Sequence, residues 1–225
     1  MATYNNICVF DFETGGKNPH ECEITQIGAC IIDRWNLKII DEFKSMAKPE
    51  NLDSVEQGAL DVTGFTIAQL EKAPNIKLVW SKFVNWVNKH NKSKGNLGSY
   101  MAPIPAGYNI LGYDMIIVNR YCKEYGPWND NRGQQKLFNP IYKIDLMDHM
   151  WFWTENNPEI KSLKLTSVCE WLGFDKEDIE NAHDALQDVH NTSKIIIRLL
   201  NMQRGLTGTD GTEARLSMKG SFADA

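Results

Sequence analysis

Two acidic residues lie inside an apolar run near the start of the sequence. Asp11 and Glu13 alternate with Phe10 and Phe12 in the segment Ile-Cys-Val-Phe-Asp-Phe-Glu, residues 7–13. In a β-strand successive side chains point to opposite faces, so the two acids share one face and the two phenylalanines the other. Neighbouring carboxylates in an apolar strand repel each other and are costly to bury, and a divalent cation would remove both costs. The pair therefore indicates a metal site, with a water-facing pair at a sheet edge as the alternative.

Three further residues could take part in the same chemistry. Asp114 lies six residues beyond the apolar segment 104–108, where a helix is expected to begin, and Asp188 lies on the last expected helix. His183 precedes Asp188 by five residues, and Asp184 is a good helix-capping residue, so His183 is expected on the loop before that helix. Each also has a plainer interpretation. Asp114 could be an acid favoured by the helix dipole, Asp188 a solvated helix residue and His183 a loop histidine without a role.

The apolar pattern predicts the elements that must position these residues. Three strands joined by short links indicate an antiparallel meander, and from about residue 74 apolar residues recur at helical spacing. This order predicts one α/β domain with a mixed sheet. The segments 91–103 and 127–139 are expected to be loops. The expected strands cover 7–13, 24–33, 37–43, 104–108 and 141–144, and the expected helices cover 75–90, 111–125, 146–153, 163–172, 175–180 and 184–203.

The composition is that of an ordinary folded domain and excludes a disordered or fibrous chain. Of 225 residues, 42% are hydrophobic and 24% charged, and no run approaches the roughly 18 apolar residues of a membrane span. The first residues carry no basic segment, so no secretory signal and a cytoplasmic location are expected. The five cysteines contain no C-x-x-C pair, which favours reduced, mostly buried thiols. The net charge of 24 − 29 = −5 disfavours a simple DNA-binding module, but not an enzyme whose acidic site binds cations.

Taken together, the acidic segments resemble those of the DEDDh family of 3′→5′ exonucleases. That superfamily includes polymerase proofreading subunits, ribonuclease T and oligoribonuclease. The resemblance spans about residues 7–203, with lesser agreement at 62–66 and 162–174. The matching segments are Val-Phe-Asp-Phe-Glu-Thr-Gly-Gly (9–16), Tyr-Asn-Ile-Leu-Gly-Tyr-Asp (108–114) and Ala-His-Asp-Ala-Leu-Gln-Asp (182–188).

The resemblance implies a ribonuclease H-like α/β fold, a five-stranded mixed sheet flanked by helices. The exonuclease domain would cover 1–204, followed by a flexible tail at 205–225. The implied reaction is hydrolysis of the terminal phosphodiester of single-stranded nucleic acid, DNA favoured over RNA, to nucleoside 5′-monophosphates. The alternative is a catalytically silent nucleic-acid-binding or scaffold module of the same fold. The dipeptide His183-Asp184 also occurs in all-α phosphohydrolases, which the strand-rich first third of the chain disfavours.

The resemblance also assigns roles to residues. Two Mg²⁺ or Mn²⁺ ions would stabilise the attacking and leaving oxygens, and hard cations of this kind suit carboxylate ligands. The ions would be held by Asp11, Glu13, Asp114 and Asp188, with His183 as the general base. The substrate-binding residues would be Phe12, Thr14, Gly15, Phe65, Asn109 and Tyr113.

The sequence also leads to expectations about one further aromatic run and about binding partners. The aromatic run Trp151–Trp153 is expected to build core rather than to stack on bases. The expected partner is the 3′ end of single-stranded DNA or RNA, with no membrane. The resemblance also leaves open a homodimer, or a polymerase or other replication partner bound through the tail.

Overall fold

The first three strands form the antiparallel meander that the sequence predicts. In the computed structural model, which describes residues 5–93, 100–180 and 183–208, β1 spans Ile7–Thr14, β2 Ile24–Ile32 and β3 Ile39–Met46. β2 pairs antiparallel with both of the others. Every β1 residue therefore has a fixed neighbour on β2, which determines what the acidic face of β1 can meet.

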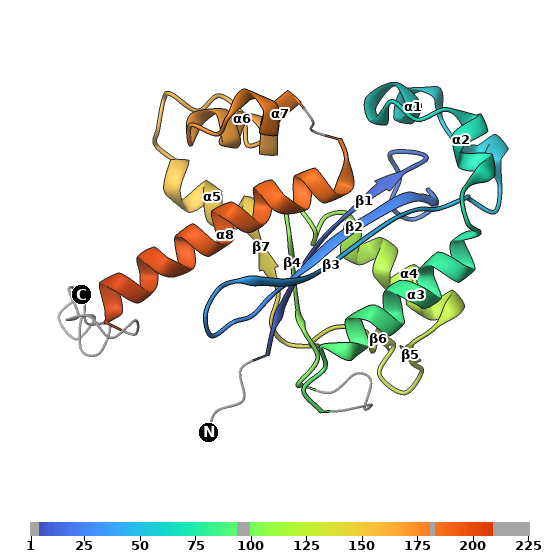
Figure 1. Ribbon diagram of the computed structural model, residues 1–225, viewed down its shortest axis with the longest axis horizontal. Helices are drawn as coiled ribbons and strands as arrows, with labels where there is room; N and C mark the ends of the chain where they lie inside the picture. The colour runs from blue at the N-terminus through green and yellow to red at the C-terminus, as the bar shows by residue number, and fades with distance from the viewer. Residues whose placement is uncertain (1–4, 94–99, 181–182, 209–225) are drawn as a thin grey trace. The chain divides into compact units, whose positions relative to one another are not determined.

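Two parallel strands extend the sheet on the other side of β1. β4 (Ile104–Gly107) pairs with β1, and β7 (Ile144–Asp145) pairs with β4. The resulting order is β3-β2-β1-β4-β7, and Figure 1 shows the five strands side by side. This five-stranded mixed sheet flanked by helices confirms the predicted fold class. Because β1, β4 and β7 are parallel, the loops that follow them leave the sheet at the same edge.

The helices agree with the predicted ones where an apolar period was visible. Each predicted helix begins within three residues of its expected start. The structure also has short helices between 52 and 72, which the apolar pattern did not predict, and a hairpin within the expected loop 127–139. The helices are η1 (Leu52–Ser54), α1 (Gln57–Thr63), α2 (Ile67–Lys72), α3 (Ile76–Lys89), α4 (Asp114–Tyr125), α5 (Leu146–Thr154), α6 (Leu165–Trp171), α7 (Lys176–Glu180) and α8 (Ala185–Thr207), and the hairpin is β5 (Trp128–Asn129) with β6 (Gln134–Gln135).

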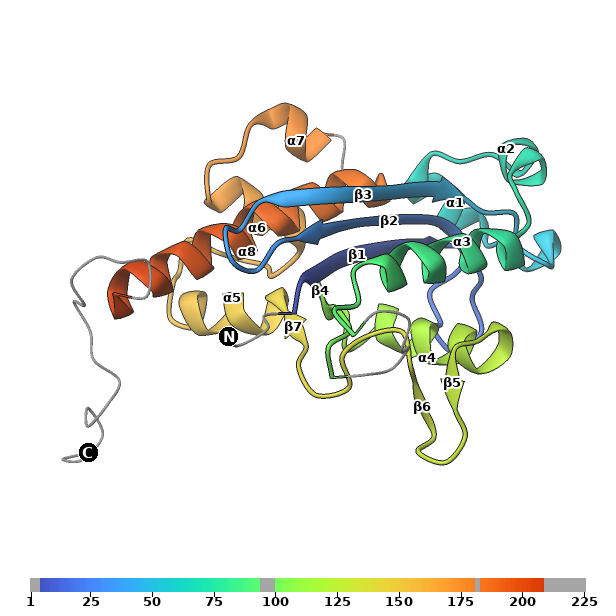
Figure 2. The same ribbon diagram turned by 60° about the horizontal axis from the view of Figure 1, so that its bottom comes forward.

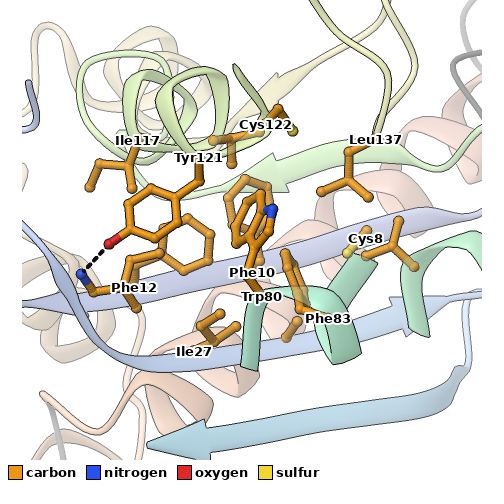
Figure 3. Packing of buried hydrophobic residues seen from close by; sticks show 14 of the residues in the cluster. Cys8, Phe10, Phe12, Ile27, Trp80, Phe83, Ile117, Tyr121, Cys122 and Leu137 are labelled. Carbon is orange, nitrogen blue, oxygen red and sulfur yellow. Dashed lines mark hydrogen bonds between the residues drawn. The ribbon is translucent and has the colours of Figure 1, made fainter. Parts of the chain in front are cut away.

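An aromatic layer fills one face of the sheet, between the strands and helices α3 and α4. Phe12 of β1 lies edge-on to Trp80 and Phe83 of α3, with ring centroids 6.4 and 6.1 Å apart. Figure 3 shows this cluster, in which the Tyr121 hydroxyl of α4 accepts the Ile24 N–H at 3.1 Å. Figure 2 shows α3 running alongside the strands with α4 next to it. Burial of these rings fixes the orientation of β1, because a slip of one residue would turn the acids into the core.

The chain divides into two compact units, Met1–Thr192 and Ser193–Ala225, and α8 runs from one into the other. All residues discussed below as a site belong to the first unit. The predicted domain boundary at residue 204 stays a prediction, and the tail segment 209–225, on which the partner expectation rests, lies outside the described residues. Residues 94–99 of the expected loop 91–103 lie outside them as well.

Two expectations from composition can be compared with the structure. All five cysteines are in the thiol form, and four of them are buried. In the described part of the chain, no helix is long and apolar enough to cross a membrane.

Candidate active site

β1 carries an acidic face opposite the aromatic layer. Asp11 and Glu13 are partly buried on that face, while Phe10 and Phe12 belong to the core, as the strand alternation predicts. Asp114 is the first residue of α4 and is buried. Its Oδ1 accepts the backbone N–H of Phe12 at 3.0 Å. The structure therefore attaches Asp114 to β1 between the two strand acids.

The start of α8 approaches the same face from β2. Gly28 pairs with Asp11 in the sheet register, and a Cβ at Gly28 would lie 2.3 Å from the carbonyl carbon of Ala185. Gln26, opposite Glu13 in the register, accepts the N–H of Ala185 through its buried Oε1 at 2.8 Å. These two contacts bring the first turn of α8 against the strand pair that carries the acids.

His183 and Asp188 reach the acidic face from this turn. The candidate ligand atoms of Glu13, His183 and Asp188 all lie within 4.8 Å of one another. The N–H of His183 donates to Asp188 Oδ2 at 3.2 Å. Oδ1 of Asp184 accepts the N–H groups of Leu186 and Gln187, at 3.2 and 3.3 Å. Asp184 therefore caps α8, and His183 precedes the helix, as the sequence predicts; Ala182 lies outside the described residues.

Burial raises the pKa values of all four acids, and repulsion from neighbouring carboxylates adds to the effect of burial. Burial and then the charge of Asp114 raise the pKa of Asp11 well above its ordinary value. Burial and the charge of Asp188 raise the pKa of Glu13 to about 8. Burial raises the pKa of Asp114 to about 7, and it also raises that of Asp188, against the opposing hydrogen bond from His183. The acids are therefore held together at an electrostatic cost that their own contacts do not remove.

The donor set fits divalent cations. Carboxylate oxygens are the ligands that Mg²⁺ and Mn²⁺ prefer, and one imidazole is compatible with Mn²⁺. No cysteine belongs to the cluster found among the described residues, which disfavours a zinc site of thiolate type. Positive charge at this position would offset the burial cost and the repulsion that raise the four pKa values.

Four of the predicted substrate-binding residues lie in the two turns beside the acids. The hydroxyls of Thr14 and Tyr113 lie 2.7 Å apart, and both lie within hydrogen-bond distance of the Gly16 carbonyl. Gly15 packs closely, since a Cβ there would lie 3.1 Å from Val55 Cγ2. The fourth, Asn109, has the left-handed φ of 58° in the turn after β4. The structure thus connects the turn after β1 to the start of α4.

The aromatic residues singled out in the sequence differ in how far they are exposed to solvent. Phe12 is only 5% exposed and its ring packs inside the aromatic layer, so the ring is not available to stack on a base, and its predicted substrate-binding role stays a prediction. Phe65 is partly buried, in the turn between α1 and α2. Trp151, Phe152 and Trp153 are 52%, 74% and 52% exposed, so the expectation that they build core is wrong.

Sequence reasoning missed the residues that hold the site elements in place. Besides Gln26 and Gly28, the buried carboxylate of Asp145 accepts the N–H groups of Asn109 and Leu111, at 2.8 and 2.9 Å. Asp145 ends β7, so it fixes the turn that leads from β4 to Asp114. The only sequence signal was an acid between an apolar strand and a helix, which also fits an ordinary helix cap.

Comparisons with known proteins agree with the resemblance seen in the sequence. A family model described as RNase_T, Exonuclease, matches residues 8–196. The 3′-5′ exoribonuclease 1 of Rattus norvegicus is 25% identical over 224 residues, which cover 96% of this chain and 56% of that protein. The chain therefore spans about half the length of this relative.

Solved structures show the same fold. A structure described as E. coli ExoI in complex with single-stranded DNA superposes with a TM-score of 0.68 and 20% identity, covering 91% of this chain and 42% of the other. One described as 3′-end specific recognition of a histone mRNA stem-loop by a 3′-exonuclease gives a TM-score of 0.63 and 22% identity. It covers 90% of this chain and 84% of the other. At these identities the likeness establishes the shared architecture.

Proposed function

The chain belongs to this exonuclease family, and we propose that it is a metal-dependent 3′-5′ exonuclease of single-stranded nucleic acid. The observation that carries the proposal is the convergence of Asp11, Glu13, Asp114 and Asp188 with one histidine on a single face of β1. Among the described residues, no Lys or Arg forms an ion pair with any of these four acids. Such a group destabilises the fold but provides suitable ligands for cations. A silent scaffold of the same fold would have no need for this electrostatic cost.

The acids would hold the cations and the histidine would move the proton. Asp11, Glu13, Asp114 and Asp188 would hold two Mg²⁺ or Mn²⁺ ions, which supply positive charge to the oxygens of an in-line displacement at phosphorus. His183 is exposed and lies beside Glu13 and Asp188, so its imidazole can reach a water at this position. It would accept a proton from that water as the water oxygen bonds to phosphorus. The bond from phosphorus to the 3′ oxygen of the preceding nucleotide breaks, and that oxygen takes a proton.

The terminal nucleotide would bind at the turns beside the acids. Thr14 and Gly15 lie where β1 ends, and Asn109 and Tyr113 lie in the turn from β4 to α4, so both turns adjoin the acids that the 3′ end would have to reach. Phe65 supplies a partly exposed ring between α1 and α2 for the terminal base. The proposal includes a preference for DNA over RNA, and the similar proteins comprise both an exoribonuclease and an exonuclease in complex with single-stranded DNA.

A direct assay tests the proposal. Matched DNA and RNA oligonucleotides labelled at the 5′ end, single- and double-stranded, are incubated with the chain in Mg²⁺, Mn²⁺ or EDTA. Stepwise shortening from the 3′ end of single strands is expected with either ion, faster on DNA, and none in EDTA. Asp188→Asn, purified identically, should be inactive because it removes one ligand charge, and it also controls for a contaminating nuclease. A folded parent chain that shortens no substrate with either ion would favour the silent module instead.

A further inference from the structure

The first turn of α8 is held against the sheet by contacts on two strands. On β2, Gly28 leaves room for the backbone of Ala185, and Gln26 accepts the Ala185 N–H. On β3, Lys44 pairs with Gly28 in the register and therefore lies in the same row across the sheet as Asp11. Lys44 reaches from this row to α8, where its Nζ donates to Asp184 Oδ2 at 2.5 Å.

Asp184 joins β3 to the helix through its two carboxylate oxygens. One oxygen accepts the Lys44 ammonium, and the other accepts the N–H groups of Leu186 and Gln187. The two oxygens belong to one planar group, so a contact that fixes one oxygen also limits the direction from which the other caps the helix. The ion pair with Lys44 therefore helps to orient the carboxylate that caps α8.

Asp184 stands between the two site residues that α8 contributes. It directly follows His183, and its carbonyl accepts the N–H of Asp188 at 3.0 Å. His183 has a φ of 72°, a left-handed conformation that a residue with a side chain adopts only when its surroundings hold it there. His183 in turn donates its N–H to Asp188 Oδ2. The positions of both residues thus depend on how Asp184 is anchored.

We propose that Lys44 is a positioning residue, which acts through Asp184 to keep His183 and Asp188 beside Glu13. This inference rests on the proposed function, because it assigns a consequence for catalysis. The Lys44 and Asp184 side chains are 44% and 36% exposed, and ion pairs exposed to this extent contribute little to the free energy of folding. Loss of the pair should therefore alter the geometry of the site rather than unfold the chain.

The chain contains a matched control on the same two elements. Glu42 lies two residues before Lys44 on β3, and its carboxylate is 2.8 Å from His190 Nε2 on α8. Glu42→Gln weakens a similarly exposed pair between β3 and α8 without touching Asp184. Comparing the Lys44 variants with Glu42→Gln therefore distinguishes an effect on the Asp184 cap from a general weakening of the contact between β3 and α8.

The test compares Lys44→Met, Lys44→Arg and Glu42→Gln with the parent chain. Lys44→Met should lower kcat about tenfold through misplacement of His183 and Asp188, with KM and the melting temperature nearly unchanged. In the metal-free protein, amide hydrogen exchange at Leu186 and Gln187 should become faster in this variant, because their acceptor is no longer fixed. Lys44→Arg keeps the charge and should restore most of both properties, and Glu42→Gln should behave as the parent.

Three results would overturn the inference. Lys44→Met could keep the parent's kcat and exchange rates, which would make the ion pair incidental. A raised KM with unchanged kcat would instead show that Lys44 touches the substrate. Glu42→Gln could lose as much kcat as Lys44→Met, which would show that any contact between β3 and α8 is sufficient. If the parent chain itself is inactive, the proposed function fails, and the exchange measurement still decides whether Lys44 anchors the cap.

Discussion

Each site residue has an environment that matches its proposed task. The four acids are buried or partly buried, and their pKa values are raised by desolvation and by the charges of neighbouring carboxylates. His183 is the most exposed of the five and adds a group that can exchange protons with solvent. The proposed ligands are thus fixed by burial, whereas the proposed proton acceptor retains access to water.

Replacement of His183 tests this division at the scale of one residue. In His183→Ala the proposed proton acceptor is lost, so kcat should fall about 10²- to 10⁴-fold, as expected for loss of a general base. The melting temperature should not change, because the side chain is exposed. Single-turnover assays with saturating divalent cation measure the rate. His20→Ala, which removes another exposed loop histidine, serves as the control, and a His183→Ala variant as fast as His20→Ala would show that the general base is a different group.

At the scale of elements, the site depends on how closely α8 approaches β2. The face of β1 is set by the aromatic layer behind it, but the acids on that face meet Asp188 only because Gly28 lacks a side chain. Gln26 then satisfies the first free N–H of the helix, which would otherwise be buried without an acceptor. The junction between the strand and the helix is therefore a structural requirement of the site.

A pair of glycine substitutions tests the junction. Gly28→Ala would place a methyl group 2.3 Å from backbone atoms that cannot move aside cheaply, so we expect a loss of roughly 1–3 kcal/mol of stability together with a loss of activity. Gly58→Ala in α1 meets no atom within 4 Å and should stabilise the chain by about 0.4–1 kcal/mol, with activity retained. Urea unfolding and the oligonucleotide assay measure both effects. Equal stability of the two variants would mean that α8 can move away from β2 without cost.

At the scale of the whole molecule, the acids make stability depend on pH and on cations. Glu13 and Asp114 have pKa values of about 8 and about 7 in the folded chain, against ordinary values of 4.5 and 3.8. The folded state therefore binds more protons than the unfolded state between about pH 4 and pH 8, and its stability must fall as pH rises through this range. A bound cation stabilises the ionised acids and opposes this loss.

Thermal unfolding at several pH values checks this expectation. In EDTA, the melting temperature should fall by several degrees from about pH 5 to about pH 8, and Mg²⁺ or Mn²⁺ should reduce the fall. Glu13→Gln removes one of the raised groups and should flatten the EDTA curve. A melting temperature in EDTA that stays constant or rises over this interval would contradict the proposed burial of four repelling acids.

Much of the fold and of the candidate site could be predicted from the sequence, because the relevant signals are local. Alternation within residues 7–13 places Asp11 and Glu13 on one face of a strand, whichever strands later pair with it. A capping residue at Asp184 places His183 before the helix, because the cap is formed with the next few N–H groups. The change of period from two to 3.6 residues predicts the order of strands and helices.

Only the tertiary structure decided which surfaces these elements cover. Trp151–Trp153 have the composition of core residues, yet they are exposed, because burial depends on what packs over a helix and not on the helix itself. Gln26 and the helix start that it binds are 159 residues apart, and no local pattern marks such a contact. Lys44 and Gly28 are likewise unremarkable in sequence. Local pattern determines which way a side chain points, whereas the approach of distant elements determines what it meets.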